Sequence, residues 1–260
     1  MAADAVSTAK PTIVFCPGAW HLPQGFDAVR AQLAERGFES EAVALPAVGA
    51  EPPTKTFADD VAAVRSQVQE LADQGKAVIV IMHSYGGLVG ADAVQDLGHA
   101  QRAKAGQKGG VIMMVYMSAF VGQKGKSVLD MLGGQYLPWM KVDGDYCFAE
   151  TPENIFYHDL AAPEQEKWIS LLRHTCTQVY TAPVAYEPWH DIPCMFLFCE
   201  NDQAIALPIQ ELMAAGMGDI TTFRCAASHS PFLSMPHKVV EALEIAAKVG
   251  LEKSTSQAVV

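Results

Sequence analysis

Short apolar runs bounded by turn-forming residues recur along this 260-residue chain and predict β-strands. Most of the runs are continuously apolar, which is typical of strands buried on both faces of a parallel sheet. The predicted strands are residues 12–16, 41–45, 77–82, 111–117, 194–199 and 221–225. We therefore expect a mostly parallel central sheet covered by helices.

Segments with helical spacing lie between the first predicted strands. Phe26, Val29 and Leu33 recur at helical intervals in residues 26–37, and Gly37 is suited to end that helix. Apolar positions in residues 56–75 repeat with helical spacing, and this segment also ends at a glycine. Alternation of strand and helix is typical of a doubly wound α/β core.

The alternation stops after residue 120 and resumes at residue 193. The stretch between these points is rich in aromatic residues and proline, and it contains no convincing strand. Its helix-like segments are residues 127–132, 152–160 and 163–176. We predict a core formed by residues 1–120 and 193–260, with residues 121–192 inserted as a helical cap. The first few residues and the polar tail at 252–260 are expected to be disordered.

Composition and charge exclude several classes of protein. Half of the residues are hydrophobic, which indicates a globular chain. Eighteen basic and 29 acidic residues give a net charge of −11, which repels phosphate backbones and anionic lipids. The first ten residues lack a signal-like pattern, and the longest apolar run, 111–121, is shorter than the roughly 20 residues of a membrane span. We expect a cytoplasmic protein that binds neither nucleic acid nor membrane.

The six cysteines lie far apart, without a C-x-x-C pair that could hold a metal or carry out redox chemistry. We expect buried thiols that pack as small hydrophobic groups, and no metal or organic cofactor. These cysteines are Cys16, Cys147, Cys176, Cys194, Cys199 and Cys225.

The strongest signal for chemistry is Ser84, which follows a buried strand and precedes Gly86, Gly87 and a helix. A strand that turns into a helix within one or two residues exposes the serine oxygen above the sheet and tolerates only small neighbours. Ser84 is thus placed as a nucleophile, although an N-cap serine would occupy the same position. Met82 stands where the usual G-x-S-x-G motif has its first glycine.

A serine nucleophile needs a general base and a carboxylate to orient that base. Asp202 and His229 follow the last two predicted strands, and loops after parallel strands emerge at the same edge as the serine. We expect His229 to be the base and Asp202 its partner, with Glu200 as the alternative carboxylate. The backbone N–H groups of Ala19 and Tyr85 are the expected oxyanion-hole donors, because the first follows a glycine turn and the second begins a helix.

Together these segments resemble the α/β-hydrolase fold superfamily, and within it the branch of plant methyl esterases, hydroxynitrile lyases and small fungal or bacterial esterases. The motifs that carry the resemblance are PGAWH at 17–21, HSYGG at 83–87, Asp202, and HSPF at 229–232. The resemblance covers residues 12–250 and implies the same roles for Ser84, His229, Asp202, Ala19 and Tyr85. Pro17 departs from the family, because many members have histidine before that glycine.

The resemblance implies a hydrolase that cleaves a carboxylic ester or lactone of a small hydrophobic molecule through an acyl-enzyme. A lyase or C–C bond-cleaving enzyme on the same scaffold is one alternative, for which only Lys141 and Lys167 offer a cap lysine. A small-molecule receptor with a vestigial triad is another. Helices that flank a sheet edge often form dimer interfaces in such folds, so the sequence is compatible with a homodimer as well as with a monomer.

Large side chains of the cap and of the loop after the first strand are expected to form the apolar walls of the substrate site. These are Trp20, His21, Tyr136, Trp139, Tyr157 and Trp189.

Overall fold

The computed structural model describes residues 10–257 and contains a six-stranded parallel sheet in the order β2-β1-β3-β4-β8-β9. All six predicted strands are present, and three have the predicted bounds. The strands are β1 (Thr12–Cys16), β2 (Ser40–Ala42), β3 (Ala77–Ser84), β4 (Gly110–Ala119), β8 (Cys194–Cys199) and β9 (Thr221–Cys225). The predicted α/β architecture is therefore confirmed.

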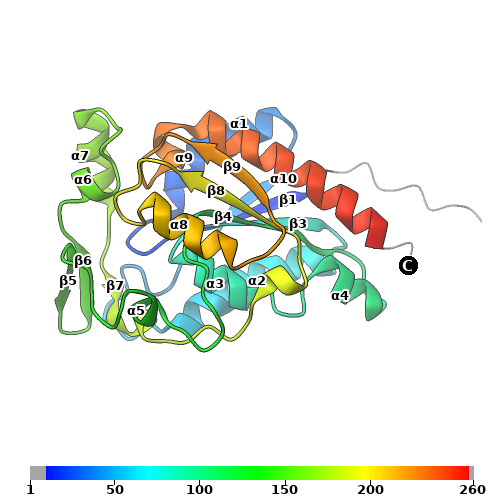
Figure 1. The fold of residues 1–260 in the computed structure, drawn as a ribbon, viewed down its shortest axis with the longest axis horizontal. Helices are drawn as coiled ribbons and strands as arrows, with labels where there is room; N and C mark the ends of the chain where they lie inside the picture. Colours follow the sequence, from blue (N-terminus) through cyan, green and yellow to red (C-terminus); the bar gives the residue numbers. More distant parts are fainter. Residues whose placement is uncertain (1–9, 258–260) are drawn as a thin grey trace, which may run out of the picture.

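Helices cover both faces of this sheet (Figure 1). Alternate strand residues point to opposite faces, so that Ile13 and Phe15 pack towards α1 (Asp27–Glu35) and α10 (Pro236–Gln257). Val14 and Cys16 pack towards α2 (Phe57–Asp73) and α3 (Gly86–Ala93). The remaining core helices are η1 (Pro23–Phe26), α4 (His99–Lys104), α8 (Leu207–Ala215) and α9 (Pro231–Ser234). Two separate hydrophobic cores result, one on each face of the sheet.

Helix α2 begins where the sequence predicts it. The Thr56 hydroxyl accepts a hydrogen bond from the backbone N–H of Asp59, and the Asp59 carboxylate accepts one from the backbone N–H of Thr56. This reciprocal capping box satisfies two N–H groups at the helix start. The long helix α10 extends to Gln257, so the expected disorder of the tail is wrong for residues 252–257, and the rest of that expectation falls outside the described residues.

The cap contains strands as well as helices, which corrects the expectation of a purely helical insertion. Its elements are α5 (Val128–Met131), β5 (Met140–Asp143), β6 (Tyr146–Ala149), α6 (Pro152–Ile155), α7 (Ala162–Leu171), β7 (Thr175–Cys176), η2 (Thr177–Tyr180) and η3 (Pro188–His190). Strands β5, β6 and β7 form an antiparallel sheet of their own. Each has only two to four residues, which is too short to display an alternating pattern.

The cap lies at the end of the core towards which β8 and β9 point (Figure 1). Loops that follow the parallel strands therefore face the cap. Within residues 10–257, no helix combines the length and the apolar character needed to cross a membrane. All six cysteines are free and buried, as predicted.

Candidate active site

The turn between β3 and α3 holds Ser84 in a strained backbone conformation, with φ at +54°. A Cβ atom added at Gly86 would lie 2.4 Å from the Pro17 carbonyl oxygen, and one at Gly87 would lie 2.1 Å from that of Phe120. Only glycine fits at these two positions, because any side chain would collide with backbone. The structure thus contains the sharp strand-to-helix turn that the sequence predicts.

The unusual Met82 is accommodated by a glycine elsewhere. Its side chain is fully buried and lies over Gly90 of α3, where an added Cβ atom would come within 2.4 Å of the Met82 sulfur. Because Gly90 has no side chain, it leaves room for the Met82 side chain. A glycine at position 82, as in the usual motif, would not need this room. This pairing explains how the tight turn persists without that glycine.

The buried side chains of His229 and Asp202 meet between the loops that follow β9 and β8. Nδ1 of His229 lies 2.8 Å from Oδ2 of Asp202, and both side chains are at most 1% exposed. The other carboxylate oxygen accepts hydrogen bonds from the backbone N–H groups of Ala204 at 2.7 Å and Ile205 at 2.9 Å. Glu200, the alternative carboxylate, is exposed. The geometry brings Asp202 rather than Glu200 to the histidine.

Ser118 and Gln210 support this pair and were not predicted. Ser118 is the bulged residue of β4, with φ at +42°, and its hydroxyl donates to Oδ2 of Asp202. A β-bulge re-aims a side chain, and here it directs a hydroxyl out of an apolar strand towards the carboxylate. The one sequence signal was that Ser118 interrupts the apolar run at 111–121.

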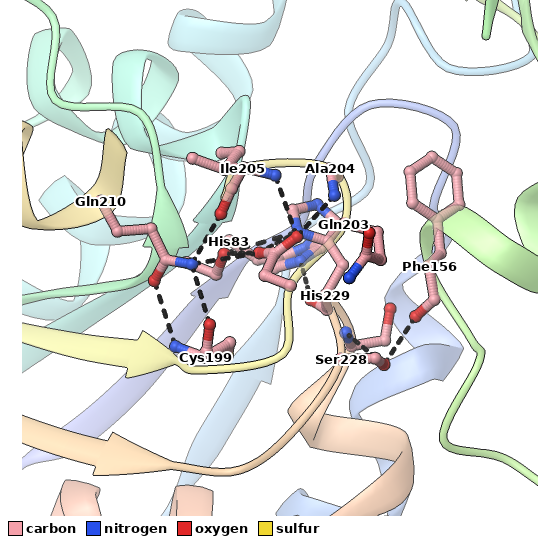
Figure 2. A network of polar contacts seen from close by, with 12 residues as sticks. His83, Phe156, Cys199, Gln203, Ala204, Ile205, Gln210, Ser228 and His229 are labelled. Carbon is pink, nitrogen blue, oxygen red and sulfur yellow. Dashed lines mark hydrogen bonds and ion pairs between the residues drawn. The ribbon is translucent and has the colours of Figure 1, made fainter. Parts of the chain in front are cut away.

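Gln210 of α8 fixes the loop that carries Asp202. Its fully buried amide donates to the carbonyl oxygens of Ile205 at 2.7 Å and Cys199 at 3.0 Å, and accepts from the Cys199 N–H at 3.1 Å. Figure 2 shows this amide between the end of β8 and the loop. A single glutamine in a helix gives no sequence signal for such a role.

His83, next to the serine, holds the loop of His229. Its Nε2 lies 2.8 Å from the backbone carbonyl oxygen of His229, and the two imidazole rings are 4.5 Å apart. Burial, with the nearby His229 and His21, holds the pKa of His83 well below its ordinary value. His83 is therefore neutral and donates a hydrogen bond to this carbonyl.

Ser84, Ala19 and Tyr85 line one cavity. Among the described residues, the backbone N–H groups of Ala19 and Tyr85 donate to no protein acceptor, which leaves both available to a ligand. In the part of the chain that the structure describes, the Ser84 hydroxyl forms no hydrogen bond with His229. Catalytic bonds of this kind are often long in a free enzyme and shorten when substrate binds.

The walls of this cavity are apolar, but only some of the residues predicted to form them line it. Trp20 and Trp139 line the cavity, together with Leu132, Leu137, Met140, Tyr180 and Ile205. His21 and Tyr157 instead line a second cavity. Tyr136 packs against Tyr180, with ring centroids 5.9 Å apart, rather than lining the cavity. Trp189 precedes β8 and so lies at the opposite edge of the sheet.

The side chain of Tyr85 is anchored on the other side of the turn. Its hydroxyl donates to Oδ2 of Asp60 at 2.9 Å, and Oδ1 of Asp60 accepts from the backbone N–H of Ala47 at 2.8 Å. Burial raises the pKa of Asp60 to about 6, although both hydrogen bonds oppose this shift. Asp60 thus anchors the side chain of Tyr85, one of the residues that line the cavity.

Two further features bear on the chemistry. Within the described part of the chain, no group of three His, Cys, Asp or Glu side chains is placed to hold a metal ion. Lys141 and Lys167, which a lyase mechanism would require near the histidine, form surface ion pairs with Glu150 at 3.3 Å and Glu164 at 3.1 Å.

Comparison with known proteins places the chain in a family. Residues 13–242 match the alpha/beta hydrolase family. The chain is 29% identical over 250 residues to "Alpha/beta hydrolase nvfD" of Aspergillus novofumigatus, covering 94% of this chain and 99% of that protein. Its fold is similar to that of a pyrethroid hydrolase from Sphingobium faniae, with a TM-score of 0.72, 19% identity and coverage of 93% and 99%. It is also similar to the methylesterase MES16 from Arabidopsis, with a TM-score of 0.71, 18% identity and coverage of 92% and 99%. The chain therefore belongs to the alpha/beta hydrolase family, as its motifs predicted.

Proposed function

We propose that this protein is a serine hydrolase that cleaves a carboxylic ester or lactone of a small hydrophobic molecule. The observation that carries the proposal is the buried hydrogen bond of 2.8 Å between His229 and Asp202, at the edge of the sheet where Ser84 ends β3. A carboxylate that orients a histidine, at the sheet edge that also carries a serine on a strained turn, matches the arrangement of serine hydrolases on this fold.

In the proposed reaction, Ser84 Oγ attacks the carbonyl carbon of the ester while His229 takes the hydroxyl proton. The carbonyl π electrons move to oxygen, and the N–H groups of Ala19 and Tyr85 stabilise the resulting oxyanion. Asp202 stabilises the imidazolium that forms and holds its orientation. The tetrahedral intermediate then collapses, the ester C–O bond breaks, and His229 protonates the leaving alkoxide. Water repeats the sequence on the acyl-enzyme and releases the acid.

The lining of the cavity supports a hydrophobic substrate. Among the residues that the structure describes, no charged side chain lines it, and the large walls are aromatic or aliphatic, with Trp20, Trp139 and Leu137 among them. A pocket of this kind recognises apolar surface and fixes orientation through few polar groups, here the two N–H donors. The names of the pyrethroid hydrolase and the methylesterase among the structural neighbours agree with ester cleavage.

A fluorophosphonate probe followed by peptide mapping tests the proposal. We expect labelling at Ser84, none in Ser84→Ala, and a rate at least about 100-fold lower in His229→Ala, because the base that activates the serine is absent. Wild-type protein and Ser84→Ala are then compared on methyl, aryl and lactone substrates. Folded wild-type protein that neither reacts with the probe nor hydrolyses any of these esters would rule out the proposed mechanism.

A further inference from the structure

Four consecutive cap residues, Phe156 to Asp159, contact three of the four loops that carry the proposed catalytic groups, all but the β3–α3 turn of Ser84 and Tyr85. We name this segment the cap bridge (residues 156–159). The loops are the oxyanion loop (residues 17–22), the acid loop (residues 200–206) and the histidine loop (residues 226–230). We propose that the cap bridge is a positioning segment, through which the cap holds these three loops in the geometry that the reaction requires. This inference rests on the proposed function.

The contact with the histidine loop is the most extensive. Asp159 accepts from the backbone N–H of Ser228 at 2.8 Å, and its other oxygen lies 2.5 Å from the Ser228 hydroxyl. The same hydroxyl lies 2.9 Å from the carbonyl oxygen of Phe156 (Figure 2). Ser228 immediately precedes His229, so these bonds fix the backbone on which the proposed base is carried. Hydrogen bonds to a carboxylate are stronger than neutral ones.

The contact with the oxyanion loop runs through His21. The hydroxyl of Tyr157 donates to Nε2 of His21 at 3.0 Å, and Nδ1–H of His21 donates to the carbonyl oxygen of Ala19 at 2.7 Å. Both side chains are buried, and burial lowers the pKa of His21 to about 4, so the ring is neutral and its two nitrogens take these opposite roles. The cap thus reaches the residue whose N–H is the proposed oxyanion donor.

The third contact is with the acid loop. Nε2 of His158 lies 2.8 Å from the carbonyl oxygen of Asn201, next to Asp202. The acid and histidine loops are also joined directly, because the Asn201 side chain donates to the carbonyl oxygen of Ala226 at 2.9 Å. No residue of the cap bridge lines the cavity that holds Ser84. The cap bridge therefore acts on the catalytic loops without lining the cavity itself.

Measuring kcat and KM separately for each variant, with p-nitrophenyl butyrate as substrate, tests this inference. Asp159→Ala should lower kcat about 10-fold or more while KM changes less than about 3-fold, because misplaced groups slow the chemical step. Asp159→Asn should restore most of kcat, because its amide oxygen still accepts from the Ser228 N–H. Tyr157→Phe should lower kcat about 5-fold, since it leaves His21 without its donor. Glu150→Ala, at an exposed ion pair of the same cap, is the matched control and should behave as wild type.

Wild-type kcat in Asp159→Ala, a change confined to KM, or no recovery in Asp159→Asn would overturn the inference. Amide hydrogen exchange supplies a readout independent of activity, in which residues 226–230 should exchange about 10-fold faster in Asp159→Ala than in Glu150→Ala. Equal exchange in these two variants would also overturn it. Failure of the fluorophosphonate probe to label wild-type protein would instead count against the proposed function, and the exchange comparison would still test the bridge.

Discussion

At the scale of single residues, Tyr85 is anchored by a buried carboxylate, Asp60. Burial makes the ionised form of Asp60 less favourable, and this free-energy cost can be measured. Asp60 is fully buried, and its folded-state pKa of about 6 lies above its ordinary value of 3.8. The folded protein therefore binds the proton more tightly than the unfolded chain. The resulting contribution to stability is complete below pH 3.8 and is lost as the pH rises through 6.

Asp60→Asn should remove this pH dependence, because the amide keeps the shape of the side chain without a titrating group. A difference of about two pKa units corresponds to about 3 kcal/mol. The free energy of unfolding of wild type minus that of Asp60→Asn should therefore fall by about 2 kcal/mol between pH 4 and pH 7, because the unfolded-state carboxyl is already more than half ionised at pH 4. Urea unfolding of both proteins across this range measures it. A constant difference would show that Asp60 titrates alike in the folded and unfolded states.

At the scale of elements, β3 and α3 pack through an unusual pair, Met82 and Gly90. Alanine favours a helix over glycine by about 1 kcal/mol, but the new methyl group of Gly90→Ala would collide with the Met82 side chain. We expect Gly90→Ala to destabilise the protein by about 1–2 kcal/mol, and Met82→Ala by about 2–4 kcal/mol through the cavity it leaves.

The double variant Met82→Ala/Gly90→Ala tests this pairing. Its methyl group at position 90 enters the space that Met82 vacates, so its loss of stability should be smaller than the sum of the two single losses by about 1 kcal/mol or more. Urea unfolding of the four proteins completes the cycle. Simple additivity would mean that Met82 and Gly90 do not share this space.

The sequence predicts most of the core elements well because they are long enough to display their patterns. Strand β3 has eight residues and helix α2 has seventeen, so local apolar spacing decides both. Strand β7 has two residues and exists because it pairs with β6, about 30 positions earlier. Its partner lies outside any local window, which is why the sequence pattern predicts helix throughout residues 163–176. The bulge at Ser118 is hidden for the same reason, because register is set between strands.

At the scale of the whole molecule, the parallel sheet explains which parts of the site could be predicted. Ser84, Asp202 and His229 follow strands whose carboxyl ends share an edge, so their proximity follows from topology alone. The contacts of Tyr157 and Asp159 depend on how the inserted cap folds back over that edge. Residue type alone predicts His21 and Tyr157 at the substrate cavity, but residue type does not reveal the direction in which a loop side chain points.

The net charge of −11 and the uncharged lining of the cavity together predict how the enzyme should discriminate between substrates. An anionic ester is repelled by the field of the protein as it approaches, and it finds no cation in the cavity lining, whereas a neutral ester experiences neither effect. Salt screens such long-range repulsion, with a Debye length of about 10 Å at 0.1 M ionic strength. We therefore expect kcat/KM for a carboxylate-bearing aryl ester to lie at least about 10-fold below that of its neutral isostere.

The difference should narrow as sodium chloride is raised from 10 mM to 300 mM, because only the anionic ester has a repulsion to be screened. Initial rates for the matched pair of esters at each salt concentration measure this, and the neutral ester controls for effects of salt on the enzyme itself. Equal kcat/KM values for the two esters would place a cationic group within reach of the bound substrate. A difference that does not change with salt would locate the discrimination in the apolar walls around Trp20 and Trp139, because contacts within a desolvated cavity are screened far less than the field outside it.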